Sequence, residues 1–119
     1  MQDFRDLKVW AKAHALTLAV YRSTEQFPKE ERYGLTSQMR RAGASIPTNI
    51  AEGCVRSSDA DFGRFLHVAL GSASELEYLI LLSRDLQFIT PADHDGLTAD
   101  LQEVKRMLIG LISRLKADG

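Results

Sequence analysis

The chain lacks the features that would assign it to several classes of protein. It has one cysteine, Cys54, so no intrachain disulfide can form, and its three histidines include no i,i+4 pair and no Glu-x-x-His motif. Bundles that bind di-iron centres take their ligands from that motif. There is no glycine-rich phosphate loop and no run of about 18 apolar residues. We therefore expect no metal, no cofactor, no catalytic residue and no membrane span.

The composition is that of an ordinary globular domain. Hydrophobic residues make up 45% and charged residues 26% of 119 residues, enough for one domain, 1–119, with a real core. The N-terminus lacks the basic-then-apolar order of a secretory signal, so we expect a cytoplasmic protein. Charge is uneven: residues 1–57 hold nine Lys/Arg and six Asp/Glu, whereas residues 58–119 hold six and ten. The basic half either binds a polyanion or complements the acidic half between helices or subunits.

Four amphipathic segments follow one another along the chain. Apolar residues at helical spacing predict helices over 7–26, 36–55, 59–88 and from 90 onward, and no segment favours a β-strand. Asp6, Ser58 and Thr90 are expected to cap the first, third and fourth helices. In the fourth, a coiled-coil-like seam is formed by Leu97, Leu101, Val104, Leu108, Leu111 and Leu115. Short connections between the segments predict an all-α, antiparallel up-down-up-down four-helix bundle.

The second segment, GLTSQMRRAGASIPTNIAEG, has almost no polar face. One stripe is apolar, and a second side carries only small residues, namely Gly43, Ala44, Pro47 and Ala51. Its only charged residues are Arg40, Arg41 and Glu52. An ordinary surface helix buries one stripe, so a helix covered on two sides predicts that the small side meets another subunit. Pro47 is expected to kink this helix without breaking it.

Several polar residues lie among apolar ones and need partners. Asn49 borders the main stripe of the second helix, and Ser72 and Glu75 lie on a second stripe of the third helix. A charge in such a place must be paired or reach water, so we expect Glu75 to pair with Arg40 or Arg41, within or between subunits. Alternatively, the arginines bind phosphate. The candidate nucleic-acid contacts are Arg5, Lys8, Lys12, Arg40, Arg41 and Arg56. The candidate structural or assembly residues are Arg40, Arg41, Ala44, Pro47, Asn49, Ala51, Glu52, Ser72 and Glu75.

Four motifs together resemble a known family. DLKVW, YGLTSQ-x-RRA, SIP-x-NIAEG and ALGS-x-x-EL are similar to the four-helix-bundle proteins encoded in intervening sequences of 23S ribosomal RNA genes, and to the related accessory variability determinant of diversity-generating retroelements. The resemblance implies a barrel-shaped homopentamer with a role near nucleic acid, because the retroelement relatives engage RNA and a reverse transcriptase. Those relatives are basic, whereas this chain has a net charge of −1.

Taken with the missing catalytic motifs, these features predict a non-enzymatic homo-oligomer that acts as a scaffold or adaptor for RNA or for a nucleic-acid enzyme. The alternative is a structural self-assembling protein that binds an unknown protein partner and no nucleic acid. The surface charge of the folded chain distinguishes the two, since a continuous basic patch favours RNA.

Overall fold

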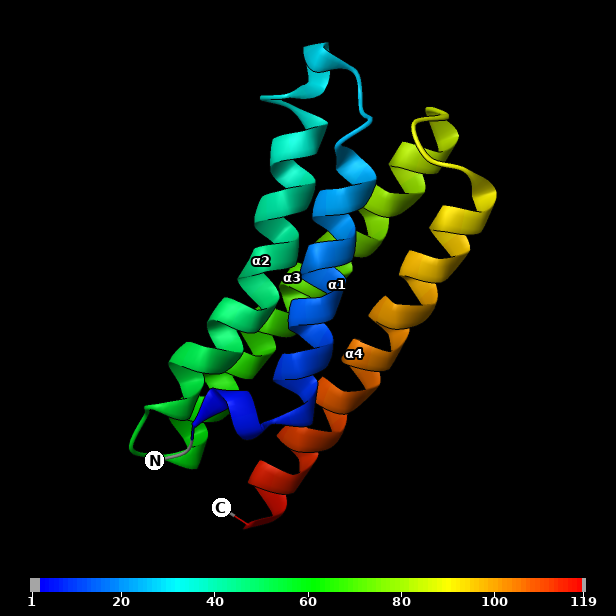
Figure 1. Cartoon of the computed structure of the whole chain (residues 1–119). Helices are drawn as coiled ribbons and strands as arrows, with labels where there is room; N and C mark the ends of the chain where they lie inside the picture. The colour runs from blue at the N-terminus through cyan, green and yellow to red at the C-terminus, as the bar shows by residue number, and fades with distance from the viewer. Residues whose placement is uncertain (1–2, 119) are drawn as a thin grey trace.

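The computed structural model describes residues 3–118 and forms an antiparallel four-helix bundle (Figure 1). Its helices are α1 (Lys8–Thr24), α2 (Leu35–Cys54), α3 (Asp59–Asp85) and α4 (Pro91–Asp118), with short 3-10 turns η1 (Phe4–Asp6) and η2 (Lys29–Glu31). The bundle measures 46 × 23 × 20 Å. The predicted all-α class and the four helices are confirmed, and each boundary that was predicted lies within three residues of the observed one.

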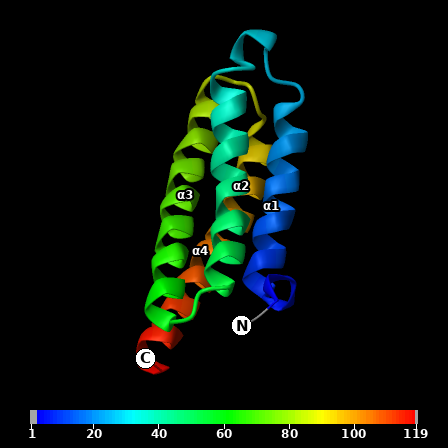
Figure 2. The same ribbon diagram turned by 90° about the vertical axis from the view of Figure 1, so that its left-hand side faces the viewer.

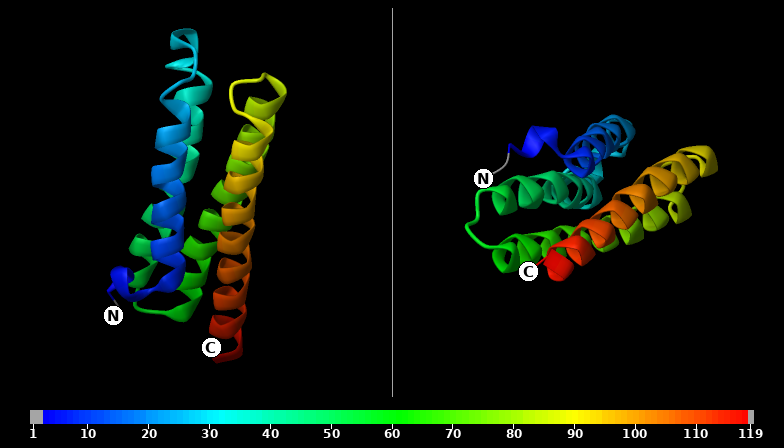
Figure 3. Two further views of the ribbon diagram at one scale, coloured as in Figure 1. Left: turned by 45° about the vertical axis from the view of Figure 1, so that its right-hand side comes forward. Right: turned by 90° about the horizontal axis from the view of Figure 1, so that it is seen from below.

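The helices are arranged so that each packs against two others. α2 packs beside α1 and α3, and α4 packs beside the same two helices. No Cα of α1 comes within 8 Å of α3, and none of α2 comes within 8 Å of α4, among the described residues. Figure 2 looks onto α3, α2 and α1, and the left view of Figure 3 looks onto α1 and α4. The α2–α3 side of the bundle is therefore opposite the α1–α4 side.

The core lies along the axis and follows most of the predicted stripes. The α4 seam is buried from Leu97 to Leu108, after which Ile112 takes the buried position instead of Leu111. A straight helix drifts relative to a strict seven-residue repeat, which explains the shift. Helical spacing also predicts a buried stripe in α1, formed by Leu7, Trp10, Ala13, Thr17, Val20, Tyr21 and Thr24. That stripe was partly wrong, because Tyr21 is exposed and the core includes Val9 and Leu16 instead.

Pro47 lies inside a continuous α2, and α1 compensates for the hydrogen bond that it removes. Proline has no N–H, so the carbonyl of Gly43 loses its helical donor. The Thr17 hydroxyl of α1 lies 3.0 Å from that carbonyl and 2.9 Å from the Ala13 carbonyl. A Cβ on Gly43 would lie 3.8 Å from Val20, so the two helices pack closely here.

This packing corrects the expectation for the small side of α2. Gly43 and Pro47 are buried within the chain itself, so they do not meet another subunit. Only Ala44 and Ala51 on that side stay partly exposed. Small residues here serve close contact between α1 and α2, because a small side chain lets two helix backbones approach.

Two of the three predicted caps are present, and the end of α3 explains where that helix stops. The cap predicted at Asp6 was wrong, because the N-cap of α1 is Leu7 and no side-chain hydrogen bond caps that helix. Ser58 accepts from the Asp61 N–H (3.1 Å), and Thr90 accepts from the Asp93 N–H (3.0 Å). α3 ends at Asp85 because Gln87 adopts a left-handed φ of 64°. The Gln87 N–H donates to the Arg84 carbonyl and the Phe88 N–H to the Ser83 carbonyl, each at 2.9 Å. These two bonds form a Schellman motif that satisfies the last carbonyls of the helix.

α3 differs from the expectation in one respect. By length and composition it is apolar enough to cross a membrane, although no such segment was expected, and it is the only helix of that kind in the described part of the chain. One side of α3, including Leu66, Ala73 and Ile80, forms the core of the bundle. Its outer side leaves Val68, Tyr78 and Leu86 exposed.

Candidate assembly and nucleic-acid surfaces

A polar groove of about 450 Å³ runs between α2 and α3, and we call it the α2–α3 groove. It is lined by Gln38, Arg41, Ala42 and Ser45 of α2 and by Ser72 and Glu75 of α3. The hydroxyls of Ser45 and Ser72 join the two helices at 2.8 Å. Asn49 Nδ2 donates to the carbonyl and hydroxyl oxygens of Ser45 at 2.8 and 3.0 Å. The groove thus has the linked hydroxyls of Ser45 and Ser72 between two charged side chains, and Asn49 holds Ser45 in place.

α2 and α3 also approach closely at a glycine near the end of α2. A Cβ on Gly53 would lie 2.7 Å from Phe62 Cδ1 and 3.1 Å from Phe65 Cβ, so no larger residue fits without movement. The structure therefore brings together four predicted residues, Arg41, Asn49, Ser72 and Glu75, from two segments of the chain. Sequence reasoning missed Gln38 and Ser45. Their spacing with Arg41 and Asn49 on one face of α2 was the available signal.

The predicted pairing of Glu75 is not formed in the described chain. Glu75 is exposed, so the assumption that its charge is buried was wrong, and no ion pair joins it to either arginine among residues 3–118. Arg40 turns toward α1, where Nε donates to Thr24 Oγ1 (2.8 Å), Nη2 donates to the Tyr21 carbonyl (3.2 Å), and the guanidinium lies 4.7 Å from the Tyr21 ring centre. Arg41 instead shares the α2–α3 groove with Glu75. Arg40 is thus a structural link between α1 and α2.

An exposed apolar stripe follows α3 beside this groove. We call Val68, Tyr78, Leu82 and Leu86 the α3 stripe, since they recur at helical spacing on the side that carries Glu75. Val68, Tyr78 and Leu86 are 48%, 58% and 47% exposed, and Leu82 is half-buried. Large apolar side chains gathered on one surface are typical of interaction sites.

The six predicted nucleic-acid contacts do not form one patch. Arg5 pairs with Asp3 at 3.2 Å and lies over Phe4, while Arg56 lies over the Phe65 ring with 4.5 Å between guanidinium carbon and ring centre. Arg40 and Arg41 point to different neighbouring helices, as described above. Only Lys8 and Lys12 share a surface, where they lie one turn apart on α1.

Two basic residues of α4 join these lysines. One groove of about 420 Å³ is lined by Lys8, Arg106 and Arg114, and a second, of about 400 Å³, by Lys8 and Lys12. The two grooves share Lys8 and Met107, and together we call them the α1–α4 trough. Its floor is apolar and includes Leu7, Ala11, Ala15, Met107 and Leu111.

The charge of the trough is mainly positive. Its acidic residues are Asp6 and Glu103, and Glu103 forms an ion pair with Arg106. Lys8, Lys12 and Arg114 form no ion pair within the part of the chain that the structure describes. Sequence reasoning missed Arg106 and Arg114 because they lie in the acidic half of the chain. The signal was their position beside the leucine seam of α4, on a face that packs next to α1.

The structure shows the surroundings of three groups of the kinds most often used in catalysis, Cys54, His14 and His94. Cys54 is buried, and burial, together with the Asp3 carboxylate, raises the pKa of its thiol, so the thiol stays protonated at neutral pH. The His14 ring stacks on Trp10 with 5.0 Å between ring centres, and His94 Nδ1 lies 2.9 Å from Asp95 Oδ1. No group of three or more metal-ligating side chains occurs among the described residues.

These features define a small all-α bundle with an apolar stripe, a polar groove and a basic trough on its surface. The sequence profile of the 23S rRNA-intervening sequence protein family matches residues 5–110, and the chain belongs to that family. This finding confirms the resemblance inferred from the four motifs.

One solved structure supports both the family and the fold. It is a crystal structure of a protein of unknown function from the S23 ribosomal protein family of Bacteroides thetaiotaomicron, 28% identical to this chain. The alignment covers 87% of this chain and 97% of that one, with a TM-score of 0.79. No curated protein matches the sequence significantly.

Proposed function

We propose that this protein is a non-enzymatic, cytoplasmic homo-oligomer, most simply a pentamer, that acts as a scaffold or adaptor and binds nucleic acid through the α1–α4 trough. One observation carries the proposal: the α2–α3 groove and the α1–α4 trough lie on opposite sides of the bundle. A second copy can therefore cover the α2–α3 side with the adjoining α3 stripe while the basic side stays accessible.

The α3 stripe supports self-assembly through the surface that it leaves in water. Fully burying a Val, Leu or aromatic side chain contributes about 1.5–3 kcal/mol of stabilisation. Covering three half-exposed side chains of this kind would therefore stabilise a contact between subunits. Glu75 and Arg41 beside the stripe have no ion-pair partner within the described chain. A neighbouring subunit can supply those partners. The prediction that Glu75 pairs with an arginine of another subunit is therefore kept. The pentamer rests on the family resemblance, and head-to-tail contacts close such a ring.

Light scattering tests the assembly. We expect the wild-type protein at micromolar concentration to have about five times the chain mass of 13.3 kDa. Val68→Lys combined with Leu86→Lys should give a monomer. Ile109→Lys is the matched control, because Ile109 is 52% exposed on α4, away from the stripe, and its variant should keep the wild-type mass. A monomeric wild-type protein would contradict the proposal.

The α1–α4 trough supports the nucleic-acid part of the proposal. Lysine and arginine side chains gathered along one seam suit phosphate oxygens, and such contacts position a strand without reading its sequence. Binding should therefore tolerate different sequences and fall steeply with salt, because it releases counterions. Repetition of the trough around a ring strengthens weak binding when one RNA spans several subunits.

Fluorescence anisotropy with structured and single-stranded RNA at low and physiological salt tests this part. Lys8→Glu with Lys12→Glu, and separately Arg106→Glu with Arg114→Glu, should each weaken low-salt binding at least tenfold. Lys29→Glu with Arg32→Glu is the control, since both residues lie at the η2 connection, outside the trough. Absence of binding at low salt with micromolar protein would remove RNA as a direct ligand.

The apolar floor of the trough favours a second candidate function. Ala11, Ala15 and Met107 between basic rims suit the apolar face of an amphipathic helix that carries acidic residues at its edges. The protein would then be a self-assembling structural protein with a protein partner. An intact oligomer that binds no RNA at low salt is the result that favours this alternative.

A further inference from the structure

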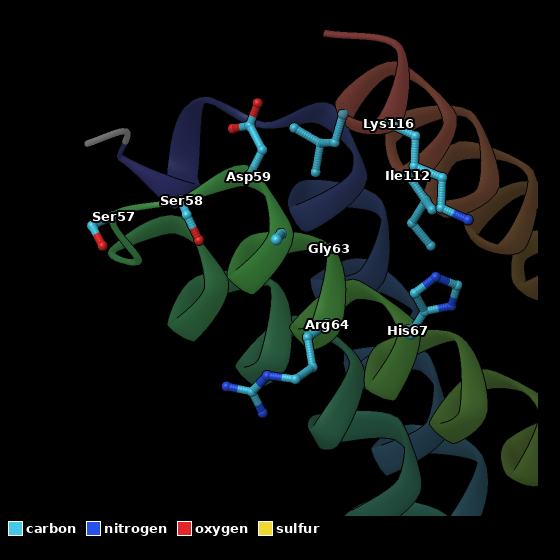
Figure 4. A pocket seen from close by; sticks show the side chains of 10 residues that line it. Ser57, Ser58, Asp59, Gly63, Arg64, His67, Ile112 and Lys116 are labelled. Atoms are coloured by element: carbon cyan, nitrogen blue, oxygen red, sulfur yellow. The ribbon is translucent and has the colours of Figure 1, made fainter. Parts of the chain in front are cut away.

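A larger pocket, which neither proposed surface includes, lies where α3 begins and α4 ends (Figure 4). We call it the α3–α4 pocket. It has a volume of about 920 Å³, roughly twice that of each groove described above. Residues that matter for its chemistry are Ala60, Gly63 and His67 of α3 and Ile112, Leu115 and Lys116 of α4. Small-molecule sites typically have volumes of about 300–1,000 Å³ and mainly apolar walls.

The pocket exists because two small residues occupy the first turns of α3. Ala60 and Gly63 lie one turn apart and both line the pocket. A Cβ built on Gly63 meets no atom within 4 Å, so space is open above it. From Leu66 onward, α3 contributes fully buried residues to the core, among them Leu66, Leu76 and Ile80. The hollow is therefore a property of this short segment and not of the whole α3–α4 contact.

The polar groups around the pocket are unevenly placed. Figure 4 shows the Lys116 amine and the His67 imidazole at the same end of the pocket, beside Ile112, with Asp59 at the other end. Arg64 points away from them, and its Nε lies 3.5 Å from Asp61 Oδ1. Neither Lys116 nor His67 forms an ion pair with any of residues 3–117, whose side chains the structure describes. One end of an apolar pocket thus offers an ammonium group and an imidazole, both able to donate hydrogen bonds to an anion.

From this arrangement we propose that the α3–α4 pocket binds a small amphipathic carboxylate. The carboxylate lies between Lys116 and His67, and the hydrocarbon body lies over Gly63 against Ile112 and Leu115. Asp59 at the opposite end disfavours ligands that carry a second negative charge there, because like charges repel. The site is independent of both the assembly surface and the basic trough.

Calorimetric titration with decanoate, below its micelle concentration, tests the proposal. Decyltrimethylammonium, a cation of the same chain length, is the matched ligand control. We expect decanoate to bind at least tenfold more tightly than the cation. Lys116→Glu, a change at an exposed position that leaves the fold intact, should weaken decanoate binding at least tenfold.

A pair of glycine variants locates the site. Gly63→Leu fills the pocket without a clash and should abolish binding. Gly96→Leu makes the same change near the start of α4, at the opposite end of that helix from the pocket, where a Cβ also meets nothing within 4 Å, and should bind decanoate like the wild type. Equal affinity of the Gly63→Leu variant and the wild type, or equal affinity for the cation and decanoate, would overturn the proposal. A changed oligomeric mass in Gly63→Leu would also overturn it, because the pocket would then be a subunit contact.

Discussion

α2 and α4 contact the same two neighbours, yet they pack against them differently. α2 meets α1 at Gly43 and α3 at Gly53, and hydroxyl hydrogen bonds from Thr17 and Ser72 link it to both helices. α4 packs through a seam of large aliphatic residues, and both grooves of the trough and the α3–α4 pocket lie along its edges. Small residues on a contact side bring helices together, whereas glycines at the edge of a contact, such as Gly63, leave open space.

This difference suggests a division of roles between the two helices. The α2 contacts are specific and hard to change, because backbone groups and side chains of three helices meet there at close range. The α4 edges tolerate change and provide surface for ligands. Substitutions that test this comparison should therefore have their largest effects around α2 and smaller effects around α4.

Gly53→Ala should have the largest effect. The added methyl would lie 2.7 Å from Phe62 Cδ1 and 3.1 Å from Phe65 Cβ, so α2 and α3 must separate or Phe62 must move. Overpacking of this kind costs about 1–3 kcal/mol of unfolding free energy. Gly63→Ala is the control: its methyl meets nothing, and it should raise stability by up to about 1 kcal/mol through helix propensity. Urea denaturation of both variants checks the result, and equal stabilities would remove the distinction between α2 and α4.

Thr17→Val should have the next largest effect. Valine keeps the shape of the side chain but removes the hydroxyl that lies 3.0 Å from the Gly43 carbonyl. This buried carbonyl then has no donor, because Pro47 lacks the N–H that would otherwise bind it. An unsatisfied buried acceptor costs about 1–3 kcal/mol. Thr48→Val, at an exposed position of α2, should change the melting temperature little. If the two variants have the same melting temperature, the Thr17 hydroxyl does not compensate for the hydrogen bond that Pro47 removes.

Gln87→Gly should stabilise the connection between α3 and α4. A residue with a side chain incurs a steric cost in the left-handed conformation that Gln87 adopts, and glycine does not. We expect a gain of up to about 1–2 kcal/mol in unfolding free energy, measured by thermal or chemical unfolding. Asp85→Gly, inside the last turn of α3, should instead lower stability. A loss on Gln87→Gly would show that the Gln87 side chain has a stabilising contact.

The smallest effect is expected at Glu77, which links α3 to α4. The hydrogen bond from Lys105 Nζ (2.8 Å) chiefly lowers the pKa of Glu77, outweighing its desolvation. The ionised Glu77 therefore stabilises the folded state fully above the usual glutamate pKa of about 4.3. This stabilisation is lost as the pH falls through the lowered pKa that Glu77 has in the folded protein.

Melting temperatures of wild type and Glu77→Gln at two pH values check this prediction. They should differ more at pH near 7 than at pH near 3. Because the Glu77 side chain is 38% exposed, the difference should stay below about 1 kcal/mol. Glu103→Gln provides the comparison, because the Glu103 side chain is also 38% exposed but pairs with Arg106 of its own helix. A difference for Glu77→Gln that is the same at both pH values would contradict the expected loss of stabilisation in acid.

The sequence by itself determined the local structure of this protein. Ser58 and Thr90 predicted where helices begin, and the spacing of Leu97, Leu101, Val104 and Leu108 predicted which side of α4 is buried. Such signals are local, because residues three and four apart share one helix face in any context. The motifs were also sufficient to predict the family, which the match over residues 5–110 confirms.

Only the tertiary structure decided which faces meet. It placed Arg106 and Arg114 beside Lys8. Both arginines lie about a hundred residues after Lys8, in the acidic half of the chain, whereas Lys8 lies in the basic half. It turned Arg40 toward α1 and left Arg41 in the α2–α3 groove, and it buried Gly43 and Pro47 within the chain. The physical reason is that the neighbours of a helix depend on how side chains from distant segments interdigitate, and helical periodicity carries no information about that packing.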